Sequence, residues 1–238
     1  MANKTSNKGK YSVSVIRKVI ALLSAWIRFY MKWDPEKIKL TVSKGNGKIG
    51  HVLNVSLAPI ITCCNCKLCK FFCYDIKAVL AYPSVLHARS RNTALFKLDR
   101  DLFFNKLWQV MKRRKKNFFL RFHVSGEIVD LDHFDRMINT ALRFPHYIIW
   151  TYTKNYAVVN EWIKQHGGNK NALPANFSVM FSEWTGLPID NPYGLPVFTC
   201  AFSEKDKEGK TVCPGNCEIC LTTKSGCPYG ESKYTLPH

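Results

Sequence analysis

The sequence predicts an α/β protein: a partial, open parallel β/α barrel, with a helix before it and a cysteine-rich loop region after it. Two observations favour this fold. Short apolar segments alternate with helical segments through the middle of the chain, which is the rhythm of a parallel sheet. Some of these segments, such as YIIWTYT and NFSVMFS, are almost continuously apolar, as strands buried on both faces are. Five predicted strands are too few for a closed eight-stranded barrel.

The N-terminal part of the chain predicts a polar tail over residues 1–10 and a helix over residues 11–33. The apolar residues of this helix recur at three- and four-residue steps: Val15, Val19, Leu22, Leu23, Trp26 and Tyr30. Arg17, Lys18 and Arg28 interrupt the apolar run, which argues against a membrane span. We expect the helix to dock on the body of the protein; a helix on a membrane surface is the alternative.

The remaining elements follow from apolar runs and helical periodicity. The predicted strands are 52–57, 118–124, 147–153, 177–182 and 196–202. The predicted helices between them are 103–115, 131–143 and 157–166. Asp132 is a candidate N-cap for the second of these helices. We divide the chain into a basic tail with an amphipathic helix (1–43), the barrel core (44–204) and a C-terminal metal-binding segment (205–238).

The net charge of the 238-residue chain is +18, and it is unevenly distributed. Residues 1–50 hold eleven Lys and Arg against two acidic residues, which is half of the excess. A second basic run, KRRKK, occupies residues 112–116. Such a surface attracts nucleic acid or another polyanion, although a solvated basic face without a partner has the same composition. No signal peptide is visible, so we expect a cytoplasmic protein.

The cysteines form two clusters. The first holds Cys63, Cys64, Cys66, Cys69 and Cys73, and the second holds Cys213, Cys217, Cys220 and Cys227. In a reducing compartment such clusters are metal ligands more often than disulfides. Thiolates at spacings of two and three residues select zinc or iron–sulfur clusters. The close spacing favours two [4Fe–4S] clusters, with zinc as the alternative.

The predicted ligands of the first site are Cys63, Cys66, Cys69 and Cys73, and all four cysteines of the second cluster are predicted ligands. The first cluster has five candidates for four places, so its fourth ligand stays open among Cys63, Cys64 and Cys66. Cys64 and Cys200 are interpreted as small buried hydrophobic residues.

Functional residues of parallel α/β folds gather where strands end. The first cysteine cluster follows the first predicted strand, and the segment RFHVSGE ends the second. Alternation along that strand predicts that Arg121, His123 and Ser125 point to one face, opposite Phe122 and Val124. We predict that this polar face contacts a cofactor and that both cysteine clusters lie on the same face of the sheet.

Gly126 is a further predicted cofactor contact, because glycine lets the backbone approach a bound group. Glu127 is predicted to bind an ammonium group or to act as an acid–base residue; a structural salt bridge with Arg121 is the alternative. Lys154 is predicted to contact an anion or a substrate, or else to be solvated. We expect surface positions for the scattered histidines, which are His51, His87, His133, His146 and His166. The chain has no Walker loop, dinucleotide glycine fingerprint or G-x-S-x-G elbow.

Four motifs in this order resemble the phage gene product 88 family: KGNGKIG at residues 44–50, the cysteine segment at 62–74, RFHVSGE at 121–127 and YTK at 152–154. The late C-P-x-x-C-x-x-C completes the resemblance, which covers roughly residues 44–227. Where the family has an aspartate after Ser-Gly, this chain has Glu127. The resemblance implies a phage origin, and with it the cytoplasm of the host cell.

A more distant resemblance is to the radical S-adenosylmethionine enzymes. In that family a C-x3-C-x2-C loop after the first strand holds a [4Fe–4S] cluster, and a G-G-E-like segment after the second strand binds the amino group of the cofactor. Residues 125–127 correspond to the second of these motifs. The first cluster here runs C-x2-C-x3-C, which argues against S-adenosylmethionine and leaves it an open alternative.

Together these patterns predict a phage-encoded iron–sulfur protein with two clusters on a radical-enzyme-like partial barrel. Whether it is an enzyme stays open. If it is, Cys63, Cys69 and Cys73 would hold a cluster with one open iron, and Glu127 and Lys154 would act beside it. The alternative is a non-catalytic cluster or zinc protein that binds nucleic acid or a host protein. The substrate and the oligomeric state do not follow from the sequence.

Overall fold

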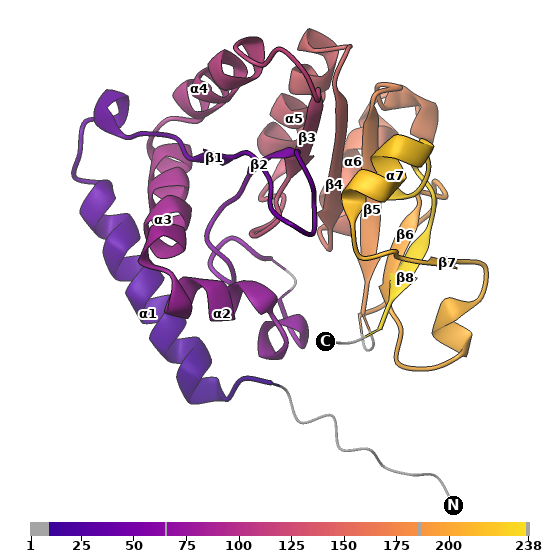
Figure 1. The fold of residues 1–238 in the computed structure, drawn as a ribbon, viewed down its shortest axis with the longest axis horizontal. Helices are drawn as coiled ribbons and strands as arrows, with labels where there is room; N and C mark the ends of the chain where they lie inside the picture. The colour runs from indigo at the N-terminus through magenta and orange to yellow at the C-terminus, as the bar shows by residue number, and fades with distance from the viewer. Residues whose placement is uncertain (1–9, 65, 185–186, 237–238) are drawn as a thin grey trace, which may run out of the picture.

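A computed structural model describes residues 10–64, 66–184 and 187–236 of the chain. Its centre is an open, mostly parallel eight-stranded sheet of order β1-β2-β3-β4-β5-β6-β8-β7 (Figure 1). Only the pair of β1 and β2 is antiparallel among the described strands. The fold is therefore mixed α/β with an open parallel sheet, as the alternation of apolar segments predicted.

All five predicted strands are present and lie side by side in chain order. They are β2 (Leu53–Val55), β3 (Phe119–Phe122), β4 (Ile148–Thr153), β5 (Phe177–Glu183) and β6 (Val197–Cys200). Three further strands are too short for a sequence signal: β1 (Val42–Ser43), β7 (Thr211–Val212) and β8 (Lys233–Thr235). β8 lies between β6 and β7, so the C-terminal segment extends the sheet at one edge.

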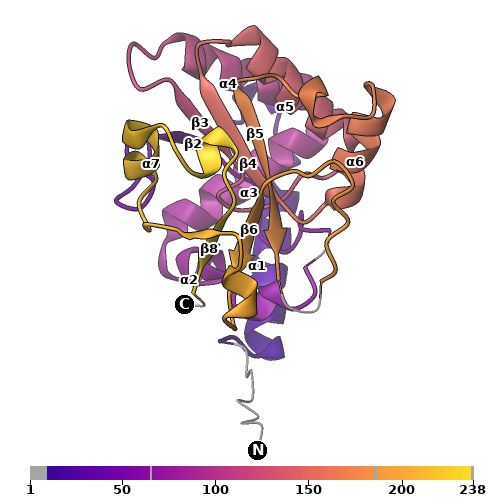
Figure 2. The same cartoon turned by 90° about the vertical axis from the view of Figure 1, so that its right-hand side faces the viewer.

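Four helices cover the outer face of the sheet. They are α3 (Pro83–Leu98), α4 (Arg100–Lys112), α5 (Leu131–Arg143) and α6 (Tyr156–Gln165). Figure 2 shows α5 and α6 on one side of the strands and α7 on the other. Leu120, Phe122 and Ile149 point from the sheet into the core formed with these helices. Short 3-10 turns complete the chain: Pro35–Lys37, Cys69–Phe71, Lys170–Ala172, Lys205–Lys207 and Cys227–Tyr229.

The N-cap of helix α5 lies two residues before the predicted one. Its N-cap is Asp130, whose side chain accepts a hydrogen bond from His133 N, and not Asp132 as predicted. Asp132 lies inside the first turn and forms ion pairs with Arg100 and Arg136. Both aspartates suit the positive end of a helix, so composition alone did not separate the cap from the second helical position.

The N-terminal helix α1 (Val13–Tyr30) docks on the body of the protein, as predicted. It packs mainly against α3 and also contacts α2 (Tyr74–Ala81). The buried stripe is rotated relative to the predicted one and consists of Ile16, Val19, Leu23, Ile27 and Tyr30. Tyr30 adds a polar anchor, since its hydroxyl lies 2.8 Å from His87 Nδ1 on α3. Among the described residues no helix combines the length and apolarity that a membrane crossing needs.

The inner face of the sheet is covered by the C-terminal segment with α7 (Cys217–Thr223). Trp150 and Tyr152 of β4 pack there against Leu221 and Cys217. In Figure 1 α7 lies in front of the strands, and α5 and α6 lie behind them. The second cysteine cluster thus lies against the strands themselves and not in a separate tail.

Candidate functional site

The first cysteine site, residues 63–73, lies in the loop that follows β2. Cys66 and Cys69 share a sulfur–sulfur hydrogen bond of 3.6 Å. Close packing against the loop at 125–127 holds this segment in place: a Cβ on Gly126 would lie 2.8 Å from both Leu57 Cβ and Thr62 Oγ1. Gly126 also has φ +85°, which favours glycine. The cysteine segment at 62–74 and the RFHVSGE motif at 121–127 are therefore in direct contact.

The thiols of the first site differ in acidity. The hydrogen bond with Cys66 and the charge of Lys154 together lower the pKa of Cys69 to about 7, against burial and the charge of Glu127, which raise it. Hydrogen bonds with Cys63 and Cys69 raise the pKa of Cys66, which burial also raises. Burial raises the pKa of Cys73 to about 12. Of Cys66, Cys69 and Cys73, Cys69 is thus the thiol that ionises most readily.

Glu127 connects the ends of β3 and β4. Its carboxylate is buried and accepts hydrogen bonds from Ile128 N at 2.9 Å and Lys154 N at 2.8 Å. Burial raises the pKa of Glu127, against the opposing charge and backbone hydrogen bond of Lys154. Among the ion pairs of the described residues Glu127 has none with Arg121, so the salt-bridge alternative is wrong for the chain as described. Its acid–base or ligand role stays a prediction.

Lys154 lies between the first site and the end of the sheet. Its ammonium group is 5.7 Å from the centre of the Trp184 ring, and its charge acts on both Cys69 and Cys200. Trp184 in turn contacts Phe72 from the first cysteine loop, with ring centres 5.9 Å apart. The contact of Lys154 with an anion or a substrate stays a prediction.

The predicted common face of Arg121, His123 and Ser125 is wrong. Arg121 lies on the inner face, over the ring of Tyr152 at 4.4 Å. His123 has φ +58°, which ends the strand alternation and sends its ring to His133 on α5. Ser125 is buried, with its backbone N donating to Ser56 Oγ and its hydroxyl without a hydrogen-bond partner among the described residues.

The second cysteine site comprises Cys213, Cys217, Cys220 and Cys227, and it lies against β4 and β5. Cys217 N donates to Lys48 O at 2.9 Å, and Ser178 Oγ donates to Cys227 O at 2.8 Å. Gly226 passes so close to Cys220 that a Cβ there would lie 2.8 Å from Cys220 Sγ. The thiols lie within electrostatic reach of one another, as the mutual effects of Cys213, Cys217, Cys220 and Cys227 show.

Arg121 of β3 links the two sites electrostatically. Arg121 lies within electrostatic reach of Cys217 and Cys227 of the second site, and of Tyr74, which follows Cys73 of the first. Within the described residues, no group of three or more His, Cys, Asp or Glu side chains is arranged so that it could hold a metal ion. The donor chemistry of both sites suits a thiophilic metal, whereas the side-chain positions do not form a ligand shell. Metal binding therefore stays a prediction.

Two cysteines outside the main ligand sets behave differently. Cys200 is buried in β6, and burial raises its pKa to about 11, as a small core residue would show. Cys64 is exposed, so its interpretation as a buried residue is wrong. The surface assignment of His133 is also wrong, since α5 buries it fully.

The sequence analysis missed Tyr152 as a partner of the second site. The charge of Cys227 acts on the Tyr152 hydroxyl, and the guanidinium of Arg121 lies over the Tyr152 ring. The signal was present in the strand IIWTYT, where Trp150 and Tyr152 alternate and so share one face. An aromatic pair on the inner face of a strand predicts that something covers it, here the C-terminal segment.

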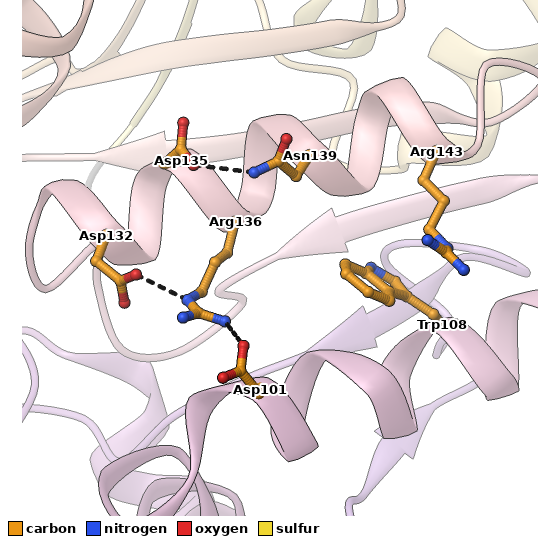
Figure 3. A pocket seen from close by; sticks show the side chains of 7 residues that line it. All are labelled: Asp101, Trp108, Asp132, Asp135, Arg136, Asn139 and Arg143. Carbon is orange, nitrogen blue, oxygen red and sulfur yellow. Dashed lines mark hydrogen bonds and ion pairs between the residues drawn. The ribbon is translucent and has the colours of Figure 1, made fainter.

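A groove of about 410 Å³ lies elsewhere, between α4 and α5. Figure 3 shows Arg136 paired with Asp101 and Asp132 in this groove, while Arg143 lies over Trp108, 4.7 Å from the ring centre. None of the predicted site residues lines it. Because Arg136 is held by Asp101 and Asp132 and Arg143 lies over Trp108, the groove carries no functional assignment.

Comparisons with known proteins give one match. No curated protein and no solved structure matches the chain. The sequence profile of the bacteriophage family Gene product 88 matches residues 32–184, more than half of the chain. This range contains the first cysteine site, Arg121, Glu127 and Lys154, and it ends before the second cysteine site. The chain therefore belongs to the Gene product 88 family.

Proposed function

We propose that this protein is an iron–sulfur protein with two thiolate-bound clusters, of which the first is the reactive one. The observation that carries the proposal is the position of Cys69, within electrostatic reach of both Glu127 and Lys154. The ends of β2, β3 and β4 supply these three groups, and the ends of parallel strands are where α/β folds place their chemistry.

The ligand assignment follows the spacing of the cysteines. Cys63, Cys66, Cys69 and Cys73 would hold the first cluster, and the four thiols of the second site would hold the other. Closely spaced thiolates in short loops support [4Fe–4S] clusters at both sites. Such clusters supply electron transfer, or radical chemistry where one iron has no protein ligand. In that second case Cys63, Cys69 and Cys73 would be the ligands.

S-adenosylmethionine is part of the proposal only because Glu127 could bind its ammonium group. Two backbone N–H groups already occupy part of its carboxylate. A carboxylate has about four lone-pair sites, so an ammonium group could still bind. The proposed catalytic roles of Glu127 and Lys154 depend on this contact between the Glu127 carboxylate and the ammonium group of the cofactor. The proposed relation of this partial barrel to the radical enzymes depends on the same contact.

Anaerobic purification with iron and sulfide reconstitution tests the proposal. We expect about eight iron and eight sulfide per chain and absorbance near ~400 nm from iron–thiolate charge transfer. Cys69→Ser and Cys220→Ser should each lose about half of this content. Cys200→Ser is the matched control and should lose none. Zinc without sulfide, or no metal at all, would overturn the proposal.

Zinc competes for the first site for a geometric reason. Tetrahedral zinc with Zn–S bonds near 2.3 Å holds its sulfurs about 3.8 Å apart. The sulfur atoms of Cys66 and Cys69 are already 3.6 Å apart.

Equilibrium binding of S-adenosylmethionine further separates an iron–sulfur site from a zinc site. If the iron-loaded protein binds S-adenosylmethionine and Glu127→Gln weakens this binding, the result supports radical chemistry. If the iron-loaded protein does not bind it, radical chemistry is removed from the proposal.

A second candidate function is polyanion binding, which a specific surface favours. Lys112, Arg113, Lys115 and Lys116 are exposed and have no ion pair among the described residues. Arg114 joins them to the basic loop at 44–51, donating to His51 O at 2.7 Å. The cationic run and this loop therefore lie together where the chain enters β2 and β3.

Binding to a short duplex DNA at increasing salt tests this candidate. Replacing Lys112, Arg113, Lys115 and Lys116 by Gln should weaken binding and reduce the salt slope by about 0.9 for each lost phosphate contact. A charge-matched control replaces Arg17, Lys18, Lys164 and Lys170 by Gln. If the two quadruple variants weakened DNA binding equally, binding would depend on the net charge of the protein and not on this surface.

A further inference from the structure

Cys66 and Cys69 form a close pair of thiols in the loop after β2. The Cys69 thiol donates to Cys66 Sγ at 3.6 Å. A disulfide bond holds its sulfurs about 2.05 Å apart, so the two atoms are about 1.5 Å from bonding distance. The spacing C-x-x-C beside a parallel sheet is typical of dithiols that are oxidised and reduced reversibly. The spacing and the contact between the sulfurs therefore point to the same chemistry.

The backbone around the pair is a loop between fixed ends. Residues 66–68 precede the 3-10 turn Cys69–Phe71 and belong to no helix or strand. Before the pair, Thr62 lies against the backbone of Gly126. After the pair, Cys73 is the N-cap of α2. Closing a bond between the two sulfurs therefore rearranges a loop and breaks no strand or long helix.

Both thiols are partly accessible, and the surface between them is cationic. Cys66 and Cys69 are half-buried, whereas Lys67 and Leu68 between them are exposed. Lys67 and Lys70 have no ion pair among the residues that the structure describes. Unpaired surface charges speed the encounter with a ligand of opposite charge. This surface therefore favours a small disulfide that carries carboxylates.

We propose that Cys66 and Cys69 are a redox-active dithiol that exchanges with an anionic small-molecule disulfide, such as oxidised glutathione. One protein thiolate attacks a sulfur of the small disulfide, whose S–S bond breaks, and the first small thiol leaves with the electron pair and takes up a proton. The second protein thiol loses its proton and attacks the mixed disulfide. The Cys66–Cys69 bond forms, and the second small thiol leaves. The protein pair is oxidised by two electrons, and the small disulfide is reduced by two.

This activity goes beyond the proposed function and does not depend on it, because the reaction uses the metal-free chain. The disulfide and the first cluster exclude one another. Only thiolates bind such metals, so an oxidised pair withholds Cys66 and Cys69 from the cluster. The oxidation state of the pair would then set how much of the protein can be loaded.

The test incubates the reduced, metal-free full chain with oxidised glutathione and maps the products by peptide mass spectrometry. We expect wild type to form the Cys66–Cys69 disulfide without accumulating a mixed disulfide, because the second step is intramolecular. Cys66→Ser and Cys69→Ser should each stop at a mixed disulfide on the remaining thiol. Cys64→Ser removes a neighbouring exposed thiol and is the matched control, which should form the disulfide as wild type does.

A neutral disulfide, bis(2-hydroxyethyl) disulfide, tests the substrate class. Replacing Lys67 and Lys70 together by Gln should slow the reaction with oxidised glutathione about two- to fivefold at low salt, as the loss of exposed charge pairs would. The reaction with the neutral disulfide should keep its rate. An unchanged rate with oxidised glutathione, or equal slowing with both reagents, would overturn the anionic substrate class.

The remaining outcomes separate this activity from the proposed function. Oxidation that joins Cys63 to Cys66, or that leaves the thiols of Cys66 and Cys69 reduced, would overturn the dithiol. If wild type forms the disulfide and its reduced form never binds metal, the dithiol stands and the proposed function fails. If reduced wild type binds iron and sulfide and forms no Cys66–Cys69 disulfide, the dithiol fails and the proposed function stands.

Discussion

The imidazole rings of His123 and His133 meet in the core with their Nε2 atoms 3.2 Å apart. His133 Nδ1 accepts a hydrogen bond from Val129 N, so the proton of the neutral His133 ring is on Nε2 and is donated to His123 Nε2. The proton of His123 is then on Nδ1, which has no hydrogen-bond partner within the described part of the chain. The pair is therefore compatible with two neutral rings.

This pair predicts a loss of stability in mild acid. Burial lowers the pKa of both rings, that of His123 to about 3, and the charges of Arg89 and of the partner ring add to the effect. The unfolded chain protonates them below about pH 6.5 and the folded chain does not. The stabilisation is complete above pH 6.5 and is lost as the pH falls toward 3.

His123→Asn should reduce the pH slope of the unfolding free energy by up to about 1.4 kcal/mol per pH unit as the pH falls from 6.5 to 5. Asparagine tolerates the left-handed backbone at this position. Chemical denaturation at four pH values measures the slope. His146→Gln replaces an exposed histidine and should leave it unchanged. An unaltered slope in His123→Asn would show that the ring is protonated in the fold.

Gly126→Ala should destabilise the contact between the first cysteine loop and the end of β3. The new Cβ would lie 2.8 Å from Leu57 Cβ and Thr62 Oγ1, and φ +85° adds backbone strain. We expect a loss of about 2 kcal/mol or more in the free energy of unfolding. Gly168→Ala has a comparable φ of +69° and open space around it, so it isolates the backbone effect. Equal losses in the two variants would mean that the close contact costs nothing.

The five parallel strands were predictable because each is buried between two layers and so reads as an apolar run. Helix α3 was not, because its buried residues mix polar and apolar types: Ser90, Asn92 and Thr93 are as buried as Ala94, Leu95 and Phe96. Asn92 donates to Thr41 O and Ser56 O, which are distant in sequence. A helix whose inward face makes long-range hydrogen bonds has no apolar period to detect.

The sequence predicted which segments of the candidate site come together, and it did not predict the directions in which their side chains point. Strand ends placed the first cysteines, Glu127 and Lys154 in one neighbourhood, because parallel strands end at one edge. The faces of Arg121 and His123 failed, since one left-handed residue at the end of β3 reversed the alternation. A left-handed backbone cannot be predicted from local sequence when the residue is a histidine, as His123 is, and not a glycine.

Asp75→Asn should be strongly destabilising, because it leaves the partner of a buried ion pair uncompensated. Arg89 of α3 makes two hydrogen bonds to Asp75 of α2, at 3.1 and 3.2 Å, and the Asp75 side chain is almost completely buried. Removing one partner of such a pair costs about 3–5 kcal/mol. Glu204→Gln breaks the exposed pair with Lys207 and should cost less than about 1 kcal/mol. Thermal unfolding of both variants gives the comparison, and similar midpoints would contradict it.

Val19→Ala tests whether the N-terminal helix is part of the folded body. Val19 is fully buried where α1 packs on α3, whereas Val13 at the start of the same helix is 52% exposed. Truncating a buried valine removes its transfer free energy and leaves a cavity, so we expect a loss of about 1.5–3 kcal/mol for Val19→Ala. Val13→Ala makes the same chemical change at an exposed position and should cost less than about 0.5 kcal/mol. Denaturant unfolding measures both. If the two variants unfolded at the same midpoint, α1 would contribute nothing to global stability and its contacts with α3 would be those of a detachable helix.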